Sequence, residues 1–250
     1  MDDVADALVI IPTYNEKENV EKIVKAVFSL DTTFHVLIVD DGSPDGTADI
    51  VKGLMANEFS GKLHIQERTG KLGLGTAYLH GFKWALKNGY DFITEMDADF
   101  SHNPNDLPRL YHACKNDGAD VAVGSRYVKG GGVKNWPLNR RLLSRYASIY
   151  VQMVTWLPVK DTTAGFVCYT RKVLETLDFQ KITFVGYAFQ IQMKFAAWRM
   201  GFKITEVPIV FKDREEGQSK MSGSIIKEAV WGVLSMKLNS FGSSYKKVKA

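Results

Sequence analysis

Two hydrophobic patterns alternate along the first half of the chain. Short runs rich in β-branched residues are separated by polar segments in which apolar residues recur every three or four positions. The runs predict strands and the spaced positions predict helices. The expected strands are 7–12, 35–40, 62–67, 91–97 and 119–125, and the expected helices cover 16–30, 48–54, 73–89 and 104–117.

This alternation predicts right-handed β-α-β crossovers and therefore an α/β fold with a doubly wound, mostly parallel sheet flanked by helices. Ligands of such sheets bind at the carboxyl ends of the strands. Four polar segments fall at those ends: Pro12–Glu16, Asp40–Asp45, Asp97–Ser101 and the position of Arg126. We therefore expect these segments to form one site.

The second half of the chain has a different pattern. A glycine-rich basic loop (130–141) leads into an aromatic-rich helix (142–157), and a second long helix is expected at 185–201. Strands are expected at 164–170 and 203–211, with Pro208 favouring the edge of a sheet. A polar loop (212–223) and an amphipathic helix (224–238) follow.

Neither a repeat nor a long linker divides the sequence, so we expect a single domain over residues 1–250. Its parts would be a nucleotide-binding half (about 7–125), an acceptor half (about 126–222), and a closing helix with a basic tail (223–250).

Composition narrows the possible functions only slightly. The chain has 250 residues, 45% hydrophobic and 24% charged, with a net charge of +4, which is too weak to argue for nucleic acid. Cys114 and Cys168 match no metal-binding spacing and are expected to be structural thiols of a reducing compartment. The acidic N-terminus is unlike a signal peptide, and no run reaches the ~18–20 apolar residues of a membrane span. We therefore expect a cytoplasmic location.

The segment "EMDADFSHNP" (95–104) places Asp97 and Asp99 one residue apart at the end of an expected strand. Such a pair has two interpretations. It can be a solvated turn, or it can hold a divalent cation, because Mg²⁺ and Mn²⁺ prefer hard oxygen ligands. A cation there would neutralise the charge of a phosphate-bearing substrate.

The wider sequence contains further motifs in a fixed order: "IPTYNEKENV", "VDDGSPDGT", "RTGKLGLGTAY", "DADFSHNP", "VGSRY", "NWPLNRRLLS", "DTTAGF", "GYAFQIQM" and "DREEGQSKM". Together they resemble the polyprenol (dolichol) phosphate mannosyltransferases of the family 2 glycosyltransferases, over about residues 7–225. The resemblance implies the GT-A fold. It also implies a metal-dependent, inverting transfer of mannose from GDP-mannose to a polyprenyl (dolichyl) monophosphate.

The same resemblance implies the residues that bind the donor. Asp97 and Asp99 would take the metal, Mg²⁺ or Mn²⁺, and the diphosphate, with Ala98 allowing close approach of the backbone. Arg214 and Lys220 would close over the diphosphate. The nucleoside pocket would be lined by Pro12, Tyr14, Glu16, Val39 and Asp41.

On the acceptor side, the resemblance places Arg126, Arg140 and Ser144 around the lipid phosphate. Arginine suits phosphate because its guanidinium donates two parallel hydrogen bonds. Asp161 is the remaining carboxylate on this side, and with Asp97, Asp99 and Arg126 it completes the expected catalytic set. A phosphate monoester has a second pKa near 6 and is largely dianionic at neutral pH, so it needs no strong general base.

Two departures from the family pattern leave alternatives open. Ser101 stands where some relatives have a Gln ligand, and Gln192 stands where many have Glu. One alternative is a polyprenyl-phosphate glucosyltransferase using UDP-glucose. Another is a non-catalytic nucleotide-sugar-binding subunit that recruits a membrane partner subunit.

A lipid acceptor requires peripheral contact with a membrane, here expected on its cytoplasmic face. Two segments could supply it: the aromatic-rich helix beginning at 142 and the amphipathic helix at 224–238 with its basic tail. Apolar stripes of this kind more often pack into a core. The sequence does not decide between the two helices.

Overall fold

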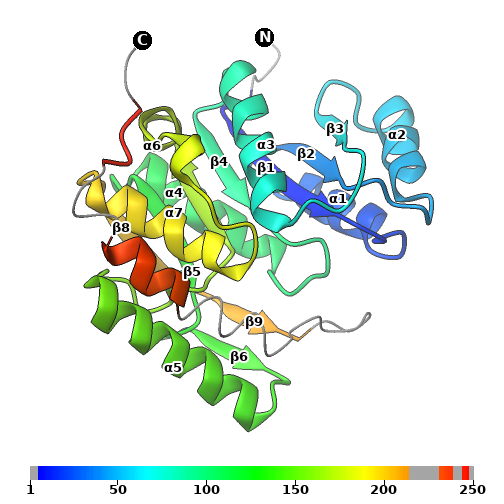
Figure 1. The fold of residues 1–250 in the computed structure, drawn as a ribbon. Coiled ribbons are helices and arrows are strands. Elements are labelled where there is room, and N and C mark those ends of the chain that lie inside the picture. The colour runs from blue at the N-terminus through cyan, green and yellow to red at the C-terminus, as the bar shows by residue number, and fades with distance from the viewer. Residues whose placement is uncertain (1–4, 214–230, 239–243, 248–250) are drawn as a thin grey trace.

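The computed structural model describes residues 5–213, 231–238 and 244–247. A seven-stranded sheet forms its centre, with helices on both faces, and a separate two-stranded sheet lies beside it (Figure 1). The strands are β1 (Ala7–Thr13), β2 (His35–Asp40), β3 (Leu63–Glu67), β4 (Phe92–Glu95), β5 (Val121–Ser125), β6 (Gly132–Lys134), β7 (Val167–Thr170), β8 (Ile204–Pro208) and β9 (Val210–Lys212).

The helices follow the alternation that the sequence predicted. They are α1 (Val20–Phe28), α2 (Thr47–Asn57), α3 (Leu74–Lys87), α4 (Leu107–Lys115), α5 (Leu138–Thr155), α6 (Arg171–Thr176) and α7 (Tyr187–Arg199), with short 3₁₀ turns η1 (Pro104–Asp106) and η2 (Phe179–Lys181). Residues 231–238 are also helical. None of the helices within the described residues is long and apolar enough to cross a bilayer.

The large sheet has the strand order β3-β2-β1-β4-β7-β5-β8. Its pairs are parallel except for β7, which runs antiparallel to both β4 and β5. The expected mostly parallel sheet is therefore confirmed. Because β1, β2 and β4 are parallel neighbours, their carboxyl ends open at the same edge.

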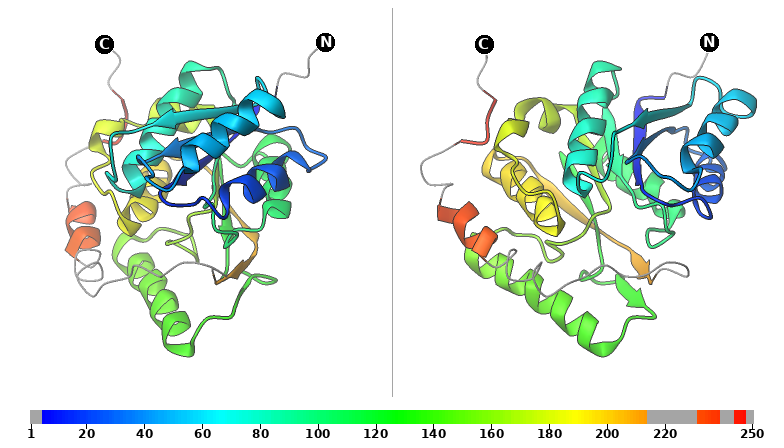
Figure 2. Two further views of the ribbon diagram at one scale, coloured as in Figure 1. Left: turned by 90° about the vertical axis from the view of Figure 1, so that its right-hand side faces the viewer. Right: turned by 45° about the vertical axis from the view of Figure 1, so that its right-hand side comes forward.

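Both faces of the sheet are buried, which explains the continuous apolar runs of its strands. Leu8 and Ile10 of β1 face a core with α3 and α7, whereas Val9 and Ile11 face a second core with α1 and α4 (Figure 2). This alternation follows from the two-residue period of a strand.

The structure corrects two expected elements. The strand expected at 203–211 is interrupted at Ile209, whose N–H donates to Ser125 O (3.0 Å) and whose carbonyl accepts from Gly132 N (2.9 Å). The chain thus leaves the large sheet and continues as β9 beside β6, in the loop expected at 130–141. Pro208 ends β8 at the sheet edge, as predicted. The helix expected from 142 begins earlier, at Leu138, directly after Pro137.

The two candidate membrane helices differ in their packing. In α5 only Ser148, Val151 and Thr155 are buried. Tyr150 and Val154 pack against the core, but most of the large apolar side chains of this helix are exposed. Of the helix expected at 224–238, the described residues are 231–238. There Val233 and Met236 belong to the core, while Trp231 is exposed.

Close packing of α3 on β1 makes Gly81 sensitive to substitution. A Cβ atom there would lie 2.8 Å from Ile10 Cγ2, and the buried β-branched Ile10 has little freedom to move. We expect Gly81→Ala to lower the free energy of unfolding by about 1–3 kcal/mol in urea denaturation. Gly53→Ala in α2 is the matched control, because nothing lies within 4 Å of its Cβ position. Helix propensity predicts that this control is stabilised by about 0.5–1 kcal/mol, so an equal response of the two variants would contradict the packing argument.

Candidate active site

The ends of β1 and β2 form a polar edge. Pro12 and Val39 are paired in the sheet, and both were expected in the nucleoside pocket. Asp40, the next residue, is buried, and its carboxylate accepts from Thr13 Oγ1 (2.8 Å), Ser43 N (2.8 Å) and Ser43 Oγ (2.6 Å). Asp40 therefore builds the turn after β2 and leaves its neighbour to face the site.

That neighbour, Asp41, is paired with a residue that the sequence did not predict. Arg68 Nε donates to Asp41 Oδ1 (2.7 Å), and Arg68 Nη1 donates to Thr76 Oγ1 in α3 (2.9 Å). The guanidinium thus holds Asp41 in place and ties the end of β2 to the start of α3. Only the position of Arg68, directly after the third strand, could have indicated this role.

Tyr14 and Glu16 lie in the loop that follows β1. Lys71 Nζ is 5.0 Å from the centre of the Tyr14 ring, within cation–π range. Glu16 Oε2 accepts from Asn19 Nδ2 (3.0 Å), and Glu16 N donates to Thr47 Oγ1 (3.1 Å). The loop is therefore connected to the start of α2. Together with Pro12, Val39 and Asp41, these residues lie at or just beyond the carboxyl ends of β1 and β2.

The acidic turn after β4 is organised by His102. Asp97 N donates to His102 Nδ1 (3.1 Å), and Ser101 N donates to Asp99 Oδ1 (3.0 Å). Burial lowers the pKa of His102, although the nearby carboxylates oppose this shift. A neutral ring keeps the Nδ1 lone pair available to the Asp97 amide. His102 was not predicted as a site residue. The sequence feature that could have indicated it is its position in the "SHNP" segment, directly after the acidic pair.

The structure brings Asp97 and Asp99 onto one turn, with the buried Ala98 between them. The Asp97 side chain is 35% exposed and that of Asp99 is largely covered. Within the described ranges, no group of three His, Cys, Asp or Glu side chains is arranged to hold a metal ion. Ser101 is buried, and its carbonyl accepts from Lys212 N (3.3 Å). From the described part of the chain, two carboxylates would therefore be available to a cation.

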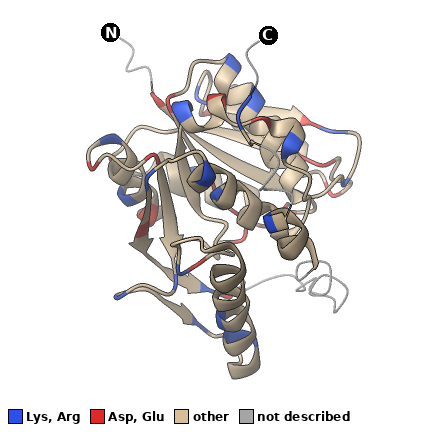
Figure 3. Cartoon of the chain, turned by 60° about the vertical axis from the view of Figure 1, so that its left-hand side comes forward, with Lys and Arg blue, Asp and Glu red and all other residues tan. Residues whose placement is uncertain are grey.

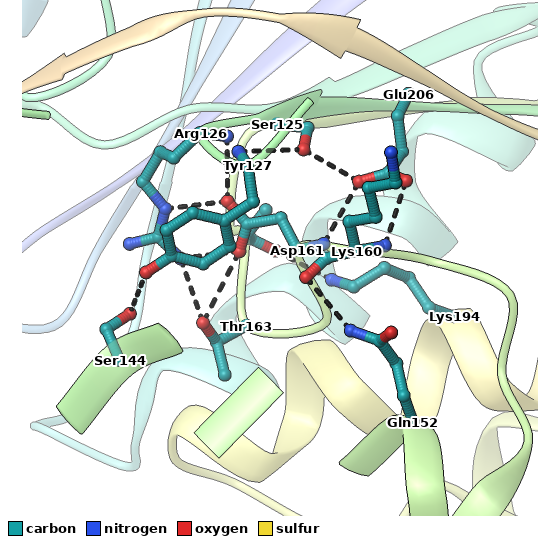
Figure 4. Close-up of polar contacts among 11 residues, drawn as sticks. Ser125, Arg126, Tyr127, Ser144, Gln152, Lys160, Asp161, Thr163, Lys194 and Glu206 are labelled. Carbon is teal, nitrogen blue, oxygen red and sulfur yellow. Dashed lines mark hydrogen bonds and ion pairs between the residues drawn. The ribbon is translucent and has the colours of Figure 1, made fainter. Parts of the chain in front are cut away.

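At the end of β5, Arg126 forms a buried ion pair with Asp161 (Figure 4). Asp161 accepts from Arg126 N (2.9 Å), Nε (2.7 Å) and Nη2 (2.6 Å), and Nη2 also donates to Thr163 Oγ1 (2.8 Å). Burial opposes the charge of Arg126, but the bonds and charge of Asp161 outweigh it and raise the pKa of Arg126. Among the residues that the structure describes, Arg126 Nη1 has no hydrogen-bond partner.

Aromatic rings surround this guanidinium. Its central carbon lies 5.2 Å from the Tyr127 ring, 5.4 Å from the Trp136 ring and 5.6 Å from the Phe211 ring. Arg140, a predicted neighbour, lies 4.3 Å over the same Trp136 ring and pairs with Asp213 (2.7 Å). Both arginines therefore lie within cation–π range of the same indole.

Ser144 joins the group through Tyr127, whose hydroxyl donates to Ser144 Oγ (2.7 Å). The structure therefore brings the three expected acceptor residues, Arg126, Arg140 and Ser144, into one cluster. Phe211 links this cluster to the acidic turn, since its ring also lies 5.4 Å from that of His102.

Glu206 supports the cluster from β8 and was not predicted from the sequence. Its carboxylate accepts from Ser125 Oγ (2.7 Å), Lys160 N (2.8 Å) and Asp161 N (3.0 Å) (Figure 4). Glu206 thus fixes the turn that carries Asp161. The available signal was a single carboxylate within the otherwise apolar strand "ITEVP".

Two titratable side chains are fully buried next to the site, Glu95 on β4 and Lys194 on α7. Burial raises the pKa of Glu95 to about 8 and lowers the pKa of Lys194 to about 8, while the attraction between them limits both shifts. Lys194 Nζ donates to Ala164 O (2.7 Å). Helix α7 therefore supports the turn of residues 161–165.

Gln192, the expected departure from the family pattern, is hydrogen-bonded to the loop before α7. Its Oε1 accepts from Thr183 N (2.9 Å) and Phe184 N (3.1 Å), and its Nε2 donates to Lys181 O (3.0 Å). Gln192 therefore organises the loop before α7. The predicted donor-loop residues Arg214 and Lys220 lie outside the described residues.

Comparison with known proteins gives the family. The model of Glycosyl transferase family 2 matches residues 8–178, more than half of the chain. The chain belongs to glycosyl transferase family 2. It is 48% identical over 235 residues to the polyprenol monophosphomannose synthase of Mycolicibacterium smegmatis, covering 90% of this chain and 86% of that protein. It is 45% identical over 231 residues to the undecaprenyl-phosphate mannosyltransferase of Micrococcus luteus, covering 90% and 93%. The predicted resemblance is therefore confirmed.

Solved structures confirm the GT-A fold of this family 2 member. Glucosyl-3-phosphoglycerate synthase from Mycobacterium tuberculosis, in complex with Mn²⁺, UDP and glucosyl-3-phosphoglycerate, matches with a TM-score of 0.65 at 15% identity, covering 93% of this chain and 78% of that one. A mannosyltransferase from Pyrobaculum calidifontis in complex with GDP-Man and Mn²⁺ matches with a TM-score of 0.56 at 14% identity, covering 96% and 76%.

The buried ion pair predicts a large effect of Asp161→Asn on stability. The substitution keeps the shape of the side chain but leaves Arg126 as an uncompensated buried charge, so we expect the free energy of unfolding to fall by about 3 kcal/mol. Urea denaturation measures this change in the free energy of unfolding. Glu21→Gln, which removes an exposed pair with Lys25, should leave the unfolding midpoint unchanged. A stable Asp161→Asn variant would show that the pair does not hold this part of the fold.

Proposed function

We propose that this chain transfers mannose from GDP-mannose to a polyprenyl (dolichyl) monophosphate with inversion at the anomeric carbon. Two of its relatives are named as a polyprenol monophosphomannose synthase and an undecaprenyl-phosphate mannosyltransferase. The observation that carries the proposal is the cluster of Arg126, Arg140 and Ser144, joined to the acidic turn through the ring of Phe211. This arrangement offers a cationic acceptor region directly beside a carboxylate-bearing donor region.

The donor would bind along the ends of β1 and β2. Asp41, oriented by Arg68, supplies a carboxylate that can accept from a ribose hydroxyl or from a guanine N–H group. Glu16 supplies a second carboxylate in the loop after β1, and Tyr14 an aromatic ring. Pro12 and Val39 line the same edge. Arg214 and Lys220, on the loop beyond the described residues, would complete the diphosphate site.

A divalent cation, Mg²⁺ or Mn²⁺, fits the acidic turn chemically. Asp97 and Asp99 are hard oxygen donors on one turn, and the partial exposure of Asp97 allows a substrate oxygen to reach the same ion. When bound, the cation neutralises the charge that develops on the departing nucleoside diphosphate. Two structural neighbours contain Mn²⁺, which supports a divalent metal without selecting one.

The acceptor phosphate would lie against Arg126 and Arg140. The ion pair with Asp161 uses Nε and Nη2 of Arg126, so Nη1 can donate to the phosphate. The guanidinium is charged at all relevant pH values. The hydroxyl of Ser144 lies on the same helix as Arg140. Both arginines are positioned by carboxylates, Asp161 and Asp213, so they meet the phosphate already oriented.

The reaction forms a bond from a phosphate oxygen to the anomeric carbon and breaks the bond from that carbon to GDP. Because the acceptor is already largely dianionic at neutral pH, no side chain has to remove a proton. Asp161 accepts three hydrogen bonds from Arg126 and acts as its positioning residue. The replacement of Glu by Gln at 192 is compatible with activity, because Gln192 binds the backbone of its own loop.

A lipid acceptor places the protein peripherally on a membrane, and we propose the cytoplasmic face. The proposal invokes neither a nucleic acid nor a membrane partner subunit. It differs from the two alternatives, a UDP-glucose-dependent glucosyltransferase and a non-catalytic subunit, in what the purified chain does alone.

A transfer assay with the purified chain in detergent tests the reaction. With a short polyprenyl phosphate we expect mannosyl product from GDP-mannose when Mg²⁺ or Mn²⁺ is present, and none after chelation. Asp97→Asn should lower kcat/KM by about 100-fold or more, because it removes a charge that the metal requires. Product from UDP-glucose alone would establish the glucosyltransferase. Binding of GDP without any product would establish the non-catalytic subunit.

The hydrogen bond from Asp97 N to His102 Nδ1 predicts a second effect. In His102→Phe the ring still packs on Phe166, but the acceptor is lost and the turn is no longer fixed. We expect the Kd for Mn²⁺ in the presence of GDP to rise by about 10-fold, as for other residues that orient metal ligands.

Isothermal titration calorimetry gives this Kd, and two further variants control for a general loss of structure. His102→Asn keeps an oxygen acceptor near the place of Nδ1 and should retain more affinity than His102→Phe. His112→Phe changes an exposed histidine of α4 and should bind Mn²⁺ normally. Equal affinities in His102→Phe and the wild-type protein would refute the positioning role.

A further inference from the structure

Helix α5 carries a row of large apolar side chains on its outer surface. We call this row the α5 stripe; its members are 36–70% exposed, and they are Leu138, Leu142, Tyr146, Ile149, Met153 and Trp156. At 3.6 residues per turn the first five fall within an arc of about 80°. The buried side chains Ser148, Val151 and Thr155 lie on the other side of the helix.

The stripe continues onto the neighbouring helical segment 231–238. Lys237 Nζ lies 4.2 Å over the ring of Trp156 and donates to Thr155 O (3.4 Å), which fixes the two elements side by side (Figure 1). Trp231 and Leu238 of this segment are 73% and 69% exposed. Soluble proteins rarely expose a continuous apolar surface of this extent unless it binds something.

The charged residues of α5 itself are all basic. Residues 126–160 contain seven Lys and Arg residues and no Asp or Glu. Arg141 and Arg145 are exposed beside the stripe on the surface of α5. Figure 3 shows basic and no acidic positions along this helix, which runs along the margin of the molecule. An apolar face with a basic border is complementary to a surface that is apolar below and negatively charged above.

We infer that the α5 stripe, with Trp231 and Leu238, docks this chain on an anionic lipid bilayer. Tyr146, Trp156 and Trp231 are suited to the boundary between headgroups and acyl chains, because each combines an apolar ring with a polar atom. A second copy of the chain is a poorer occupant. Its stripe would carry the same basic border, including Arg141 and Arg145, and therefore offers no opposite charge to this one.

The docked orientation predicts where the acceptor phosphate lies relative to the membrane, and this inference rests on the proposed function. Arg140 and Ser144 also belong to α5 but lie on its inner side, where they contact Asp213 and Tyr127. A helix with its side chains is about 10–12 Å in diameter. The acceptor phosphate would therefore be held one helix thickness from the membrane surface, while its polyprenyl chain remains in the bilayer.

Vesicle flotation with the full-length chain tests the inference. We expect the wild-type protein to float with vesicles of phosphatidylcholine mixed with phosphatidylglycerol, and much less with phosphatidylcholine alone. The double variant Tyr146→Glu/Met153→Glu should lower the partition coefficient at least about 10-fold, because it places charge within the apolar face. Arg141→Gln/Arg145→Gln should remove most of the preference for the anionic vesicles.

Matched controls separate the stripe from general effects of charge. Leu72→Glu changes an exposed leucine (56%) outside α5, and Lys22→Gln/Lys87→Gln removes two exposed charges from α1 and α3. Both controls should float like the wild-type protein. Unchanged thermal unfolding of each variant shows that its fold is intact.

Three results would overturn the inference: wild-type protein that does not float, stripe variants that float normally, or a lipid-free dimer that the stripe variants convert to a monomer. The proposed function is measured separately, as mannose transfer to a short polyprenyl phosphate in solution. Flotation without transfer would refute the function and leave the docking surface standing. Transfer without flotation would refute the docking surface and leave the proposed function standing.

Discussion

The buried ion pair between Arg126 and Asp161 is the interaction on which the rest of the site depends. Neither charge has enough contact with water to be stable alone, so each requires the other in a fixed geometry. Glu206 holds the turn of Asp161, and three aromatic rings enclose the guanidinium. The pair thereby connects β5, β8 and the 161–165 turn, and it directs one guanidinium nitrogen away from its partner.

Neighbouring residues in this site have separate tasks. Asp40 and Asp41 are adjacent, yet the Asp40 carboxylate accepts hydrogen bonds within the turn after β2, whereas the Asp41 carboxylate accepts from Arg68. Likewise, Gln190 is buried without a hydrogen-bond partner for its amide atoms within the described chain, whereas Gln192 binds the backbone of residues 181–184. A motif identifies the segment that reaches the site; hydrogen bonding decides which of its residues act there.

The sequence predicted the central strands and helices because burial on both faces of a sheet leaves long apolar runs. It did not predict β6 or the break at Ile209, since three-residue strands contain too few positions to show alternation. The site segments were found because strand ends converge in parallel sheets. Arg68, His102 and Glu206 were missed because their roles arise from partners between 5 and 81 residues away, as with His102 and Asp97 or Glu206 and Ser125. The packing of α5 was also unpredictable, because an apolar stripe looks the same whether a core or solvent covers it.

The antiparallel strand β7 has a consequence for synthesis of the protein. Its register pairs Thr170 with Phe92 of β4, and it also separates β4 from β5. Both neighbours of β5, namely β7 and β8, come later in the chain, so β5 has no sheet partner when it leaves the ribosome. A nascent chain ending near residue 125 would present β5 and one edge of β4 unpaired, and such edges readily join other chains. The sheet of residues 7–125 is therefore complete only after β7 and β8 have been made.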